Sequence, residues 1–157
     1  MPGQIYPLIF SYAQGNLVWV ETHKDPRWEN RNYSVIKIKN IWNGNTRQFT
    51  HKSRFMSVAI SPDGKQIAAT ENTSDNKNNL VLFSTTDKSR LQSIPVPDNA
   101  YLQQPDWSTD GMKITFIFLT GAGEGIISYN LVSSTWTTLV KAGRDNLRSA
   151  KIRNDSL

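Results

Sequence analysis

Ser61-Pro62-Asp63-Gly64 is the stretch that decides the fold, because it returns as Ser108-Thr109-Asp110-Gly111. The step from the first glycine to the second is 47 residues. In such a turn, proline pre-sets φ at the first corner, aspartate tolerates the second corner, and glycine takes the left-handed position that closes a tight hairpin. One copy predicts an ordinary hairpin, whereas two copies in the same frame predict a repeat.

The flanks of the two turns repeat as well. Apolar residues 55–60 precede the first copy, residues 102–107 precede the second, and a lysine and an isoleucine follow each turn. A weaker copy of the frame surrounds Gly15, which keeps only the glycine of the motif. A fixed period between about 20 and 50 residues is typical of solenoids, propellers and repeat arrays.

The secondary structure predicted within each repeat unit distinguishes these architectures. Each unit is predicted to form four short β segments bounded by Gly, Pro, Asn and Asp. The segments are Met56–Ile60, Gln66–Glu71, Leu80–Ser84 and Leu91–Ile94 in the second unit, and Gln103–Trp107, Lys113–Leu119, Gly125–Asn130 and Thr135–Val140 in the third. Four short strands in a unit of about 45 residues match a propeller blade. The sequence therefore predicts an all-β fold of about three four-stranded antiparallel β-propeller blades, as an open arc or as part of a larger propeller.

The repeat frame also sets the expected boundaries within what reads as a single domain. We expect blade 1 at about residues 5–52, blade 2 at about 53–98 and blade 3 at about 99–143. Residues 144–157 are expected to start a next blade.

The net charge, the length of apolar runs and the lack of cysteine limit which partners and sites are expected. The chain has 157 residues and a formal net charge of +5, and its basic residues are spread along the sequence apart from a denser group near the C-terminus. Such a spread indicates a solvated basic surface, so we expect no nucleic-acid partner. No apolar run reaches the roughly 18–20 residues that cross a bilayer, so no membrane insertion is predicted. The lack of cysteine excludes disulfides, thiolate zinc sites and cysteine nucleophiles.

Residues 105–114, Pro-Asp-Trp-Ser-Thr-Asp-Gly-Met-Lys-Ile, resemble the repeat of TolB-like β-propellers, whose core is usually written Pro-x-Trp-Ser-Pro-Asp-Gly-Lys. Residues 58–67 are similar, with Ile60 in the place of the tryptophan. The run from Thr46 to Asp63 resembles the propeller part of large exported proteins of the Bacteroidetes type. The resemblance covers nearly the whole chain and implies the fold, but one fold hosts many functions.

Two classes of function follow from this resemblance. The leading expectation is a non-catalytic propeller module of a larger protein that binds a protein or peptide, or acts as a scaffold. The rival is an accessory substrate-gating or carbohydrate-active propeller part of a peptidase-like or lyase-like enzyme. The resemblance also implies a periplasmic or otherwise extracytoplasmic location, although residues 1–4, Met-Pro-Gly-Gln, do not open a signal peptide.

Three blades leave two open ends, because propellers usually close with four to eight blades. Exposed end faces need cover or drive association. We therefore expect either a longer parent chain or self-association through the open blade ends, with two copies forming a six-bladed assembly.

No catalytic group, metal site or cofactor is predicted. His23 lies near acidic residues but has no third ligand at metal-binding spacing, so an exposed loop histidine is the preferred interpretation. Residues 75–79 are rich in oxygen ligands without EF-hand spacing, and the glycine-rich residues 121–125 lack the Gly-Lys-Ser/Thr of a phosphate loop. The sequence contains no Gly-x-Ser-x-Gly elbow and no His-Glu-x-x-His.

Aromatic residues supply the best binding candidates. Trp19, Trp42, Trp107 and Trp136 lie in strand-like segments and are expected to pack between blades. Trp28 instead lies in a polar insert beside Arg27, where it is either a binding anchor or part of a loop folded back on its own blade.

The position of a binding face follows from analogy with other propellers. They bind where the loops entering each new blade meet the loops between second and third strands. Here these are residues around 51–54, 99–102 and 145–148, with 22–32 and 72–77. The candidate binding residues are Arg27, Trp28, Arg54 and Tyr101.

Overall fold

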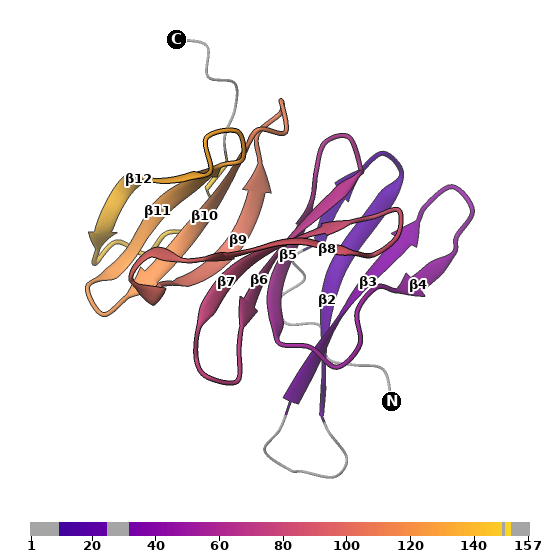
Figure 1. The fold of residues 1–157 in the computed structure, drawn as a ribbon, viewed down its shortest axis with the longest axis horizontal. Coiled ribbons are helices and arrows are strands. Elements are labelled where there is room, and N and C mark those ends of the chain that lie inside the picture. The colour runs from indigo at the N-terminus through magenta and orange to yellow at the C-terminus, as the bar shows by residue number, and fades with distance from the viewer. Residues whose placement is uncertain (1–9, 25–31, 149, 152–157) are drawn as a thin grey trace.

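The computed structural model describes residues 10–24, 32–148, 150 and 151, and within this part the chain forms three antiparallel sheets of four strands each (Figure 1). The strands of each sheet follow one another in chain order. Together they confirm the predicted all-β propeller fold. Blade 1 contains β1 (Phe10–Ala13), β2 (Asn16–Lys24), β3 (Asn32–Asn40) and β4 (Thr46–Gln48); blade 2 contains β5 (Phe55–Ile60), β6 (Gln66–Asn72), β7 (Asn78–Ser84) and β8 (Arg90–Pro95); blade 3 contains β9 (Tyr101–Trp107), β10 (Lys113–Thr120), β11 (Gly123–Asn130) and β12 (Thr135–Gly143).

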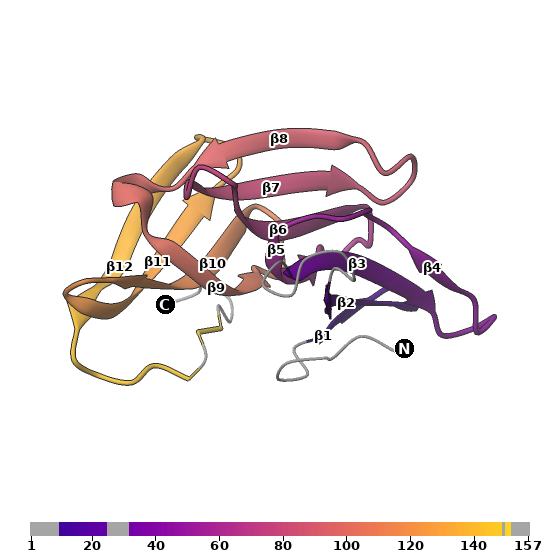
Figure 2. The same cartoon turned by 90° about the horizontal axis from the view of Figure 1, so that it is seen from below.

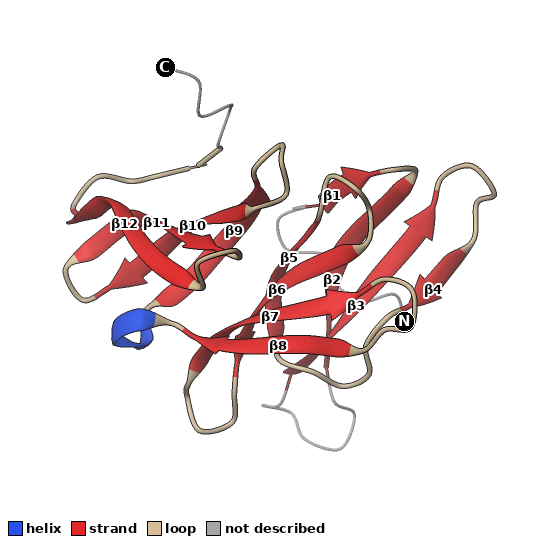
Figure 3. Cartoon of the chain, turned by 45° about the horizontal axis from the view of Figure 1, so that its top comes forward, coloured by secondary structure: helices blue, strands red, loops and turns tan. Residues whose placement is uncertain are grey.

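The three blades lie side by side with blade 2 in the middle (Figure 2). Strand β5 contacts β1 on one side and β9 on the other, so the first strands of successive blades are neighbours. A single turn of 3-10 helix, Pro97–Asn99, links β8 to β9 (Figure 3). In the described part of the chain no helix is long and apolar enough to cross a membrane.

The repeated turn has the predicted geometry. Gly64 and Gly111 have φ of 72° and 70°, the left-handed region that favours glycine. Their amides donate to the carbonyls of Ser61 and Ser108 at 2.8 and 2.9 Å. Blade 1 replaces this motif with a shorter turn, Gln14-Gly15, between the paired residues Ala13 and Asn16. Positive φ at both turn residues is the mark of a type I′ hairpin.

Apolar side chains fill the space between neighbouring blades. Val18, Ile36 and Ile38 of blade 1 pack against Ile67 and Phe83 of blade 2. Alternation along a strand sends the next residue to the opposite face. The other face of blade 2 therefore presents Ala68, Leu80 and Leu82 to blade 3, which covers them with a second cluster that includes Trp107, Ile114 and Phe116.

The tryptophans follow the sequence prediction in part. Trp107 is buried between blades 2 and 3, where its indole N–H donates to the Ala59 carbonyl at 3.2 Å. Trp136 packs on the same cluster and donates to the Pro95 carbonyl at 3.2 Å. The prediction was wrong for Trp42, which lies in the β3–β4 turn with 74% of its surface exposed. Strand β3 ends at Asn40, whose side chain caps the turn and takes Trp42 out of the sheet.

The chain after β12 lies against blade 3. The Leu147 amide donates to the Glu124 carboxylate at 2.7 Å, and Ala150 is buried. The expectation of a next blade rested on residues 144–157, and the described ones among them (144–148, 150 and 151) are not in a strand.

Candidate binding face

One end of the blades gathers the loops that were selected from the sequence. Strand β5 starts where β6 ends, because Phe55 pairs with Glu71, and the β6–β7 hairpin follows directly. The loop entering blade 3 reaches the same hairpin, since the side chain of Asn99 accepts from the Asn78 amide at 2.7 Å. We call this end, with the residues that enter β5 and β9 and the β6–β7 hairpin, the entry face.

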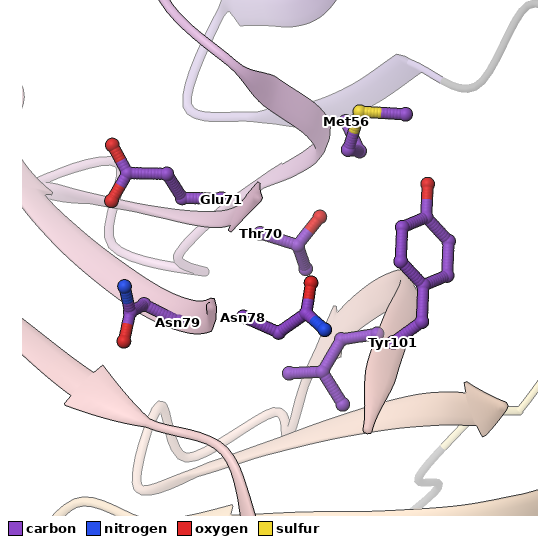
Figure 4. Close-up of a pocket in the computed structure, with 7 residues that line it drawn as sticks. Met56, Thr70, Glu71, Asn78, Asn79 and Tyr101 are labelled. Carbon is purple, nitrogen blue, oxygen red and sulfur yellow. The ribbon is translucent and has the colours of Figure 1, made fainter. Parts of the chain in front are cut away.

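A shallow hollow lies on the entry face where blade 2 meets blade 3. Its empty volume is about 160 Å³, which includes space open to solvent. In Figure 4, Thr70 and Asn78 lie between Tyr101 on one side and Glu71 with Asn79 on the other. The lining residues are Met56, Thr70, Glu71, Asn78, Asn79, Tyr101 and Leu102.

Two of the polar lining groups, those of Thr70 and Glu71, are held by contacts within blade 2. The Thr70 hydroxyl lies 2.7 Å from the Ser57 hydroxyl and accepts from the Ser57 amide at 3.1 Å. The Glu71 carboxylate pairs with the Arg90 guanidinium at 2.8 Å. These contacts hold the Thr70 and Glu71 side chains in place at the hollow.

Asn99 joins the two blades beneath the hollow. Its main-chain carbonyl accepts from the Asn78 side chain at 2.8 Å, and its own side chain donates to the Asn76 carbonyl at 2.9 Å. Its φ of 52° is left-handed, a conformation that asparagine tolerates better than most residues. These bonds fix the position of Tyr101, two residues further along the chain, relative to blade 2.

Two side chains at the rim remain available to a ligand. Met56 is 51% exposed, and Tyr101 is half-buried. Burial raises the pKa of the Tyr101 phenol. The hydroxyl therefore stays protonated at neutral pH and can both donate and accept a hydrogen bond. A thioether beside a phenol forms an adaptable apolar contact with one polar end.

The structure places two of the four predicted binding residues. Arg54 and Tyr101 both lie on the entry face, immediately before β5 and at the start of β9. The Arg54 carbonyl accepts from the Asn72 amide at 3.1 Å, while its side chain is exposed and forms no ion pair within the described residues. Arg27 and Trp28 lie outside the described residues. A role of any of the four in binding stays a prediction.

The histidines have local structural partners. The His23 ring lies 3.4 Å from the Glu21 carboxylate and stacks on Tyr33 at a centroid distance of 5.4 Å. His51 lies 3.2 Å from the Gln48 side chain. Among the residues that the structure describes, no group of three or more His, Cys, Asp or Glu is placed to hold a metal ion.

Sequence reasoning missed most of the hollow. Met56 and Asn79 belong to strands and carry no motif, and they become neighbours of Tyr101 only when blade 3 packs on blade 2. Alternation along the strand gives no signal here either, because the register between β5 and β6 shifts between Phe55 and Ser57 and leaves Met56 without a paired residue.

Comparison with known proteins rests on structure alone, because no family model and no curated protein matches this chain. The β-propeller domain of the Trilobed protease from Pyrococcus furiosus superposes on 87% of the chain with a TM-score of 0.66 and 17% identity. TolB from Acinetobacter baumannii superposes on 83% with a TM-score of 0.65 and 13% identity. The chain folds as blades of a TolB-like β-propeller.

The same TolB-like fold occurs in the acylaminoacyl peptidase of Pyrococcus horikoshii, which covers 88% of this chain with a TM-score of 0.65 and 14% identity. The chain spans 42%, 31% and 25% of the lengths of the protease domain, TolB and the peptidase, respectively. TolB-like blades thus occur as parts of longer proteins. At these identities the similarity shows the fold and assigns no activity.

Proposed function

We propose that these TolB-like blades form a non-catalytic binding module of a larger protein, and that the entry face binds an extended peptide segment of a protein partner. A periplasmic or other extracytoplasmic location belongs to the same proposal. The similarity to TolB supports the proposed location. The similarity to a propeller domain within a longer protease supports the proposal of a module of a larger protein.

The observation that carries the proposal is the hollow beside Tyr101. Its empty volume of about 160 Å³ includes space open to solvent, so it is a surface hollow rather than an enclosed small-molecule pocket, and it suits contact with one side chain of a partner. Met, Tyr and Arg are enriched at protein interfaces. Met56 and Tyr101 line the hollow, and the exposed Arg54 lies two residues before Met56 in the chain. A partner would insert an apolar side chain against Met56 and Tyr101 and hydrogen-bond to the phenol.

Affinity selection of peptides from a random displayed library tests this proposal, because such a library samples short peptide sequences without favouring any one partner. Peptides selected on the wild-type protein are synthesised, and their affinities are measured by calorimetry. We expect Tyr101→Ala and Arg54→Ala to weaken binding by about tenfold each, which corresponds to about 1.4 kcal/mol.

Val132→Ala is the matched control, because Val132 is exposed in the β11–β12 turn and does not line the hollow. It should leave the peptide affinity unchanged. Selected peptides that bind Tyr101→Ala and Arg54→Ala as tightly as wild type, with unaltered melting temperatures, would show that the entry face is not the binding surface.

A further inference from the structure

The exposed Trp42 lies away from the entry face. The start of β3 (Asn32–Asn40) is close to the chain entering β5, because Ser34 bonds to Ser53, and the β3–β4 turn follows the opposite end of the strand (Figure 1). Trp42 is 74% exposed there, and the preceding Ile41 is 48% exposed. So large an exposed apolar side chain is a candidate contact surface for a ligand.

The turn that carries Trp42 is held by its own hydrogen bonds. The Asn40 side chain accepts from the amides of Trp42 and Asn43 at 3.0 and 3.1 Å. The Asn43 side chain accepts from the Asn45 amide at 3.0 Å, and the Asn40 amide donates to the Asn45 carbonyl at 2.9 Å. The backbone under the indole is therefore preorganised, which lowers the entropy lost on binding.

One part of the indole rests on Gly15. A Cβ atom at Gly15 would lie 2.6 Å from Cε2, Cζ2 and Cη2 of Trp42, closer than real Cβ contacts allow. Gly15 is buried even though the turn residues 41–45 are exposed. Glycine is thus required for the indole to lie against the backbone of the neighbouring hairpin.

The other blades show that this pairing is particular to blade 1. The Ile41 amide donates to the Gly15 carbonyl, just as the Thr85 amide donates to Lys65 and the Leu131 amide to Met112. The position of Gly15 is therefore taken by side-chain-bearing residues in blades 2 and 3.

The turn itself does not need a tryptophan. The residues equivalent to Trp42 are Thr86 and Val132, whose amides bond to the Ser84 and Asn130 side chains in the same way. A threonine and a valine thus complete the same capped turn. Since the ring is neither buried nor required by the turn, its presence points to a contact with a ligand.

Residues near Trp42 in the turn carry uncharged amides. Residues 40–45 contain no charged residue, and the Gln14-Gly15 hairpin that supports the ring is flanked by Asn16. Asn43 and Asn45 are exposed, and their side-chain NH₂ groups donate no hydrogen bond within the described residues. A side-chain amide donates and accepts, as a hydroxyl does. This rim suits a neutral ligand with many hydroxyls.

We propose that Trp42 and the amides around it form a binding site for a neutral oligosaccharide. The apolar C–H face of a flat pyranose ring stacks on the exposed indole, whose π face is electron-rich. The ring hydroxyls bond to the side chains of Asn43 and Asn45. A proline-rich peptide fits less well, because such peptides dock in grooves lined by several aromatic side chains.

Binding of cellohexaose, a neutral β-linked glucose oligomer, tests the site. Titration is followed by the indole N–H resonance of Trp42 in two-dimensional NMR and by calorimetry. We expect this resonance to shift on saturation. Trp42→Thr, which installs the residue of blade 2, should weaken binding by at least about tenfold, while Trp42→Phe should weaken it less.

Val132→Thr is the matched control at the equivalent position of blade 3, and it should leave cellohexaose affinity unchanged. An oligogalacturonate titration separates neutral from acidic sugars, and it should show weaker binding than cellohexaose. The proposal is overturned if cellohexaose fails to bind, if Trp42→Thr binds it as wild type does, or if oligogalacturonate binds more tightly. It is also overturned if proline-rich peptides compete for Trp42 more tightly than the sugar.

Discussion

At the scale of single residues, tryptophan has different surroundings in blade 1 and in blade 3. Trp107 is 8% exposed and fills the seam between blades 2 and 3, whereas Trp42 is 74% exposed at a turn. The buried indole has a polar atom to satisfy, and it does so on the Ala59 carbonyl. An indole in a core is tolerated only where its N–H finds a partner.

Replacing Trp107 with phenylalanine tests this account. The change removes the hydrogen bond to the Ala59 carbonyl and leaves part of the seam unfilled. An unsatisfied buried polar group costs about 1–3 kcal/mol, so we expect Trp107→Phe to lower the free energy of unfolding by about that amount. Urea denaturation measures it. Trp42→Phe is the control and should change stability by less than about 0.5 kcal/mol. Equal effects of the two changes would contradict this account.

At the scale of elements, the repeated turn is stabilised by a charge as well as by its glycine. The Ser61 hydroxyl donates to the Asp63 carboxylate at 2.6 Å, and the Lys65 amide donates to the same oxygen at 3.0 Å. Ser108 and Asp110 repeat the pair at 2.6 Å. The hydrogen bond from Ser61 is the main cause that lowers the pKa of Asp63 below its usual 3.8.

This lowered pKa gives the turn a pH dependence with a definite sign. A carboxyl whose folded pKa is lower than its unfolded pKa stabilises the fold above the unfolded value and loses that effect as pH falls through the folded value. We expect Ser61→Ala to destabilise the protein by about 0.5–1.5 kcal/mol at pH 7. The difference from wild type should shrink between pH 4 and pH 2, as Asp63 is protonated in both proteins.

Urea denaturation at pH 7, 4 and 2 provides the measurement. Ser93→Ala, an exposed change on β8, is the control and should show the same small effect at each pH. A Ser61→Ala penalty that stays constant down to pH 2 would mean that the Asp63 charge does not contribute.

At the scale of the whole molecule, the two ends of the arc differ. On β3, Lys37 and Lys39 occupy the positions that Val81 and Phe83 occupy on β7, as the cross-strand registers show. Lys37 is paired with the buried Glu21 at 2.7 Å. The face of blade 1 turned away from blade 2 thus carries charged groups where the equivalent face of blade 2 is apolar. It also carries apolar and aromatic residues, because Leu17 and Trp19 pair with these lysines and with Tyr12 and Phe10.

Blade 3 presents a different outer face. Thr115 and Ser128 face each other across β10 and β11, and their buried hydroxyls have no hydrogen-bond partner. They stand where blade 2 has Ala68 and Leu82, the residues that blade 3 covers. Both end faces therefore include polar groups that the apolar clusters between the described blades lack.

Self-association through the open ends stays a prediction, and Lys39 offers a way to test it. Lys39→Phe restores the residue that blade 2 has at this position, so it should strengthen association by adding apolar area to the end face. Sedimentation equilibrium across micromolar concentrations measures this. Lys65→Phe adds the same area at an exposed turn and is the control. If wild type and Lys39→Phe are both monomeric throughout, the ends do not pair.

Most of the fold could be predicted, because it depends on local chemistry that repeats. Three patterns in the sequence predict the four-stranded blade. They are the Asp-Gly turns, the β-branched segments and the 47-residue step from Gly64 to Gly111. The binding face was predicted only in outline. Arg54 and Tyr101 follow from their place before a blade, but Met56 and Asn79 join them through packing between blades.

The sequence by itself determined that this chain makes four-stranded blades, since turn residues and strand periodicity act within a few residues of each other. Only the tertiary structure decided which tryptophans are buried. Trp42 and Trp107 both follow a strand-like pattern, yet one ring has a neighbouring blade on it and the other has only Gly15 beneath it. Burial depends on what lies opposite a side chain, and that partner is distant in sequence.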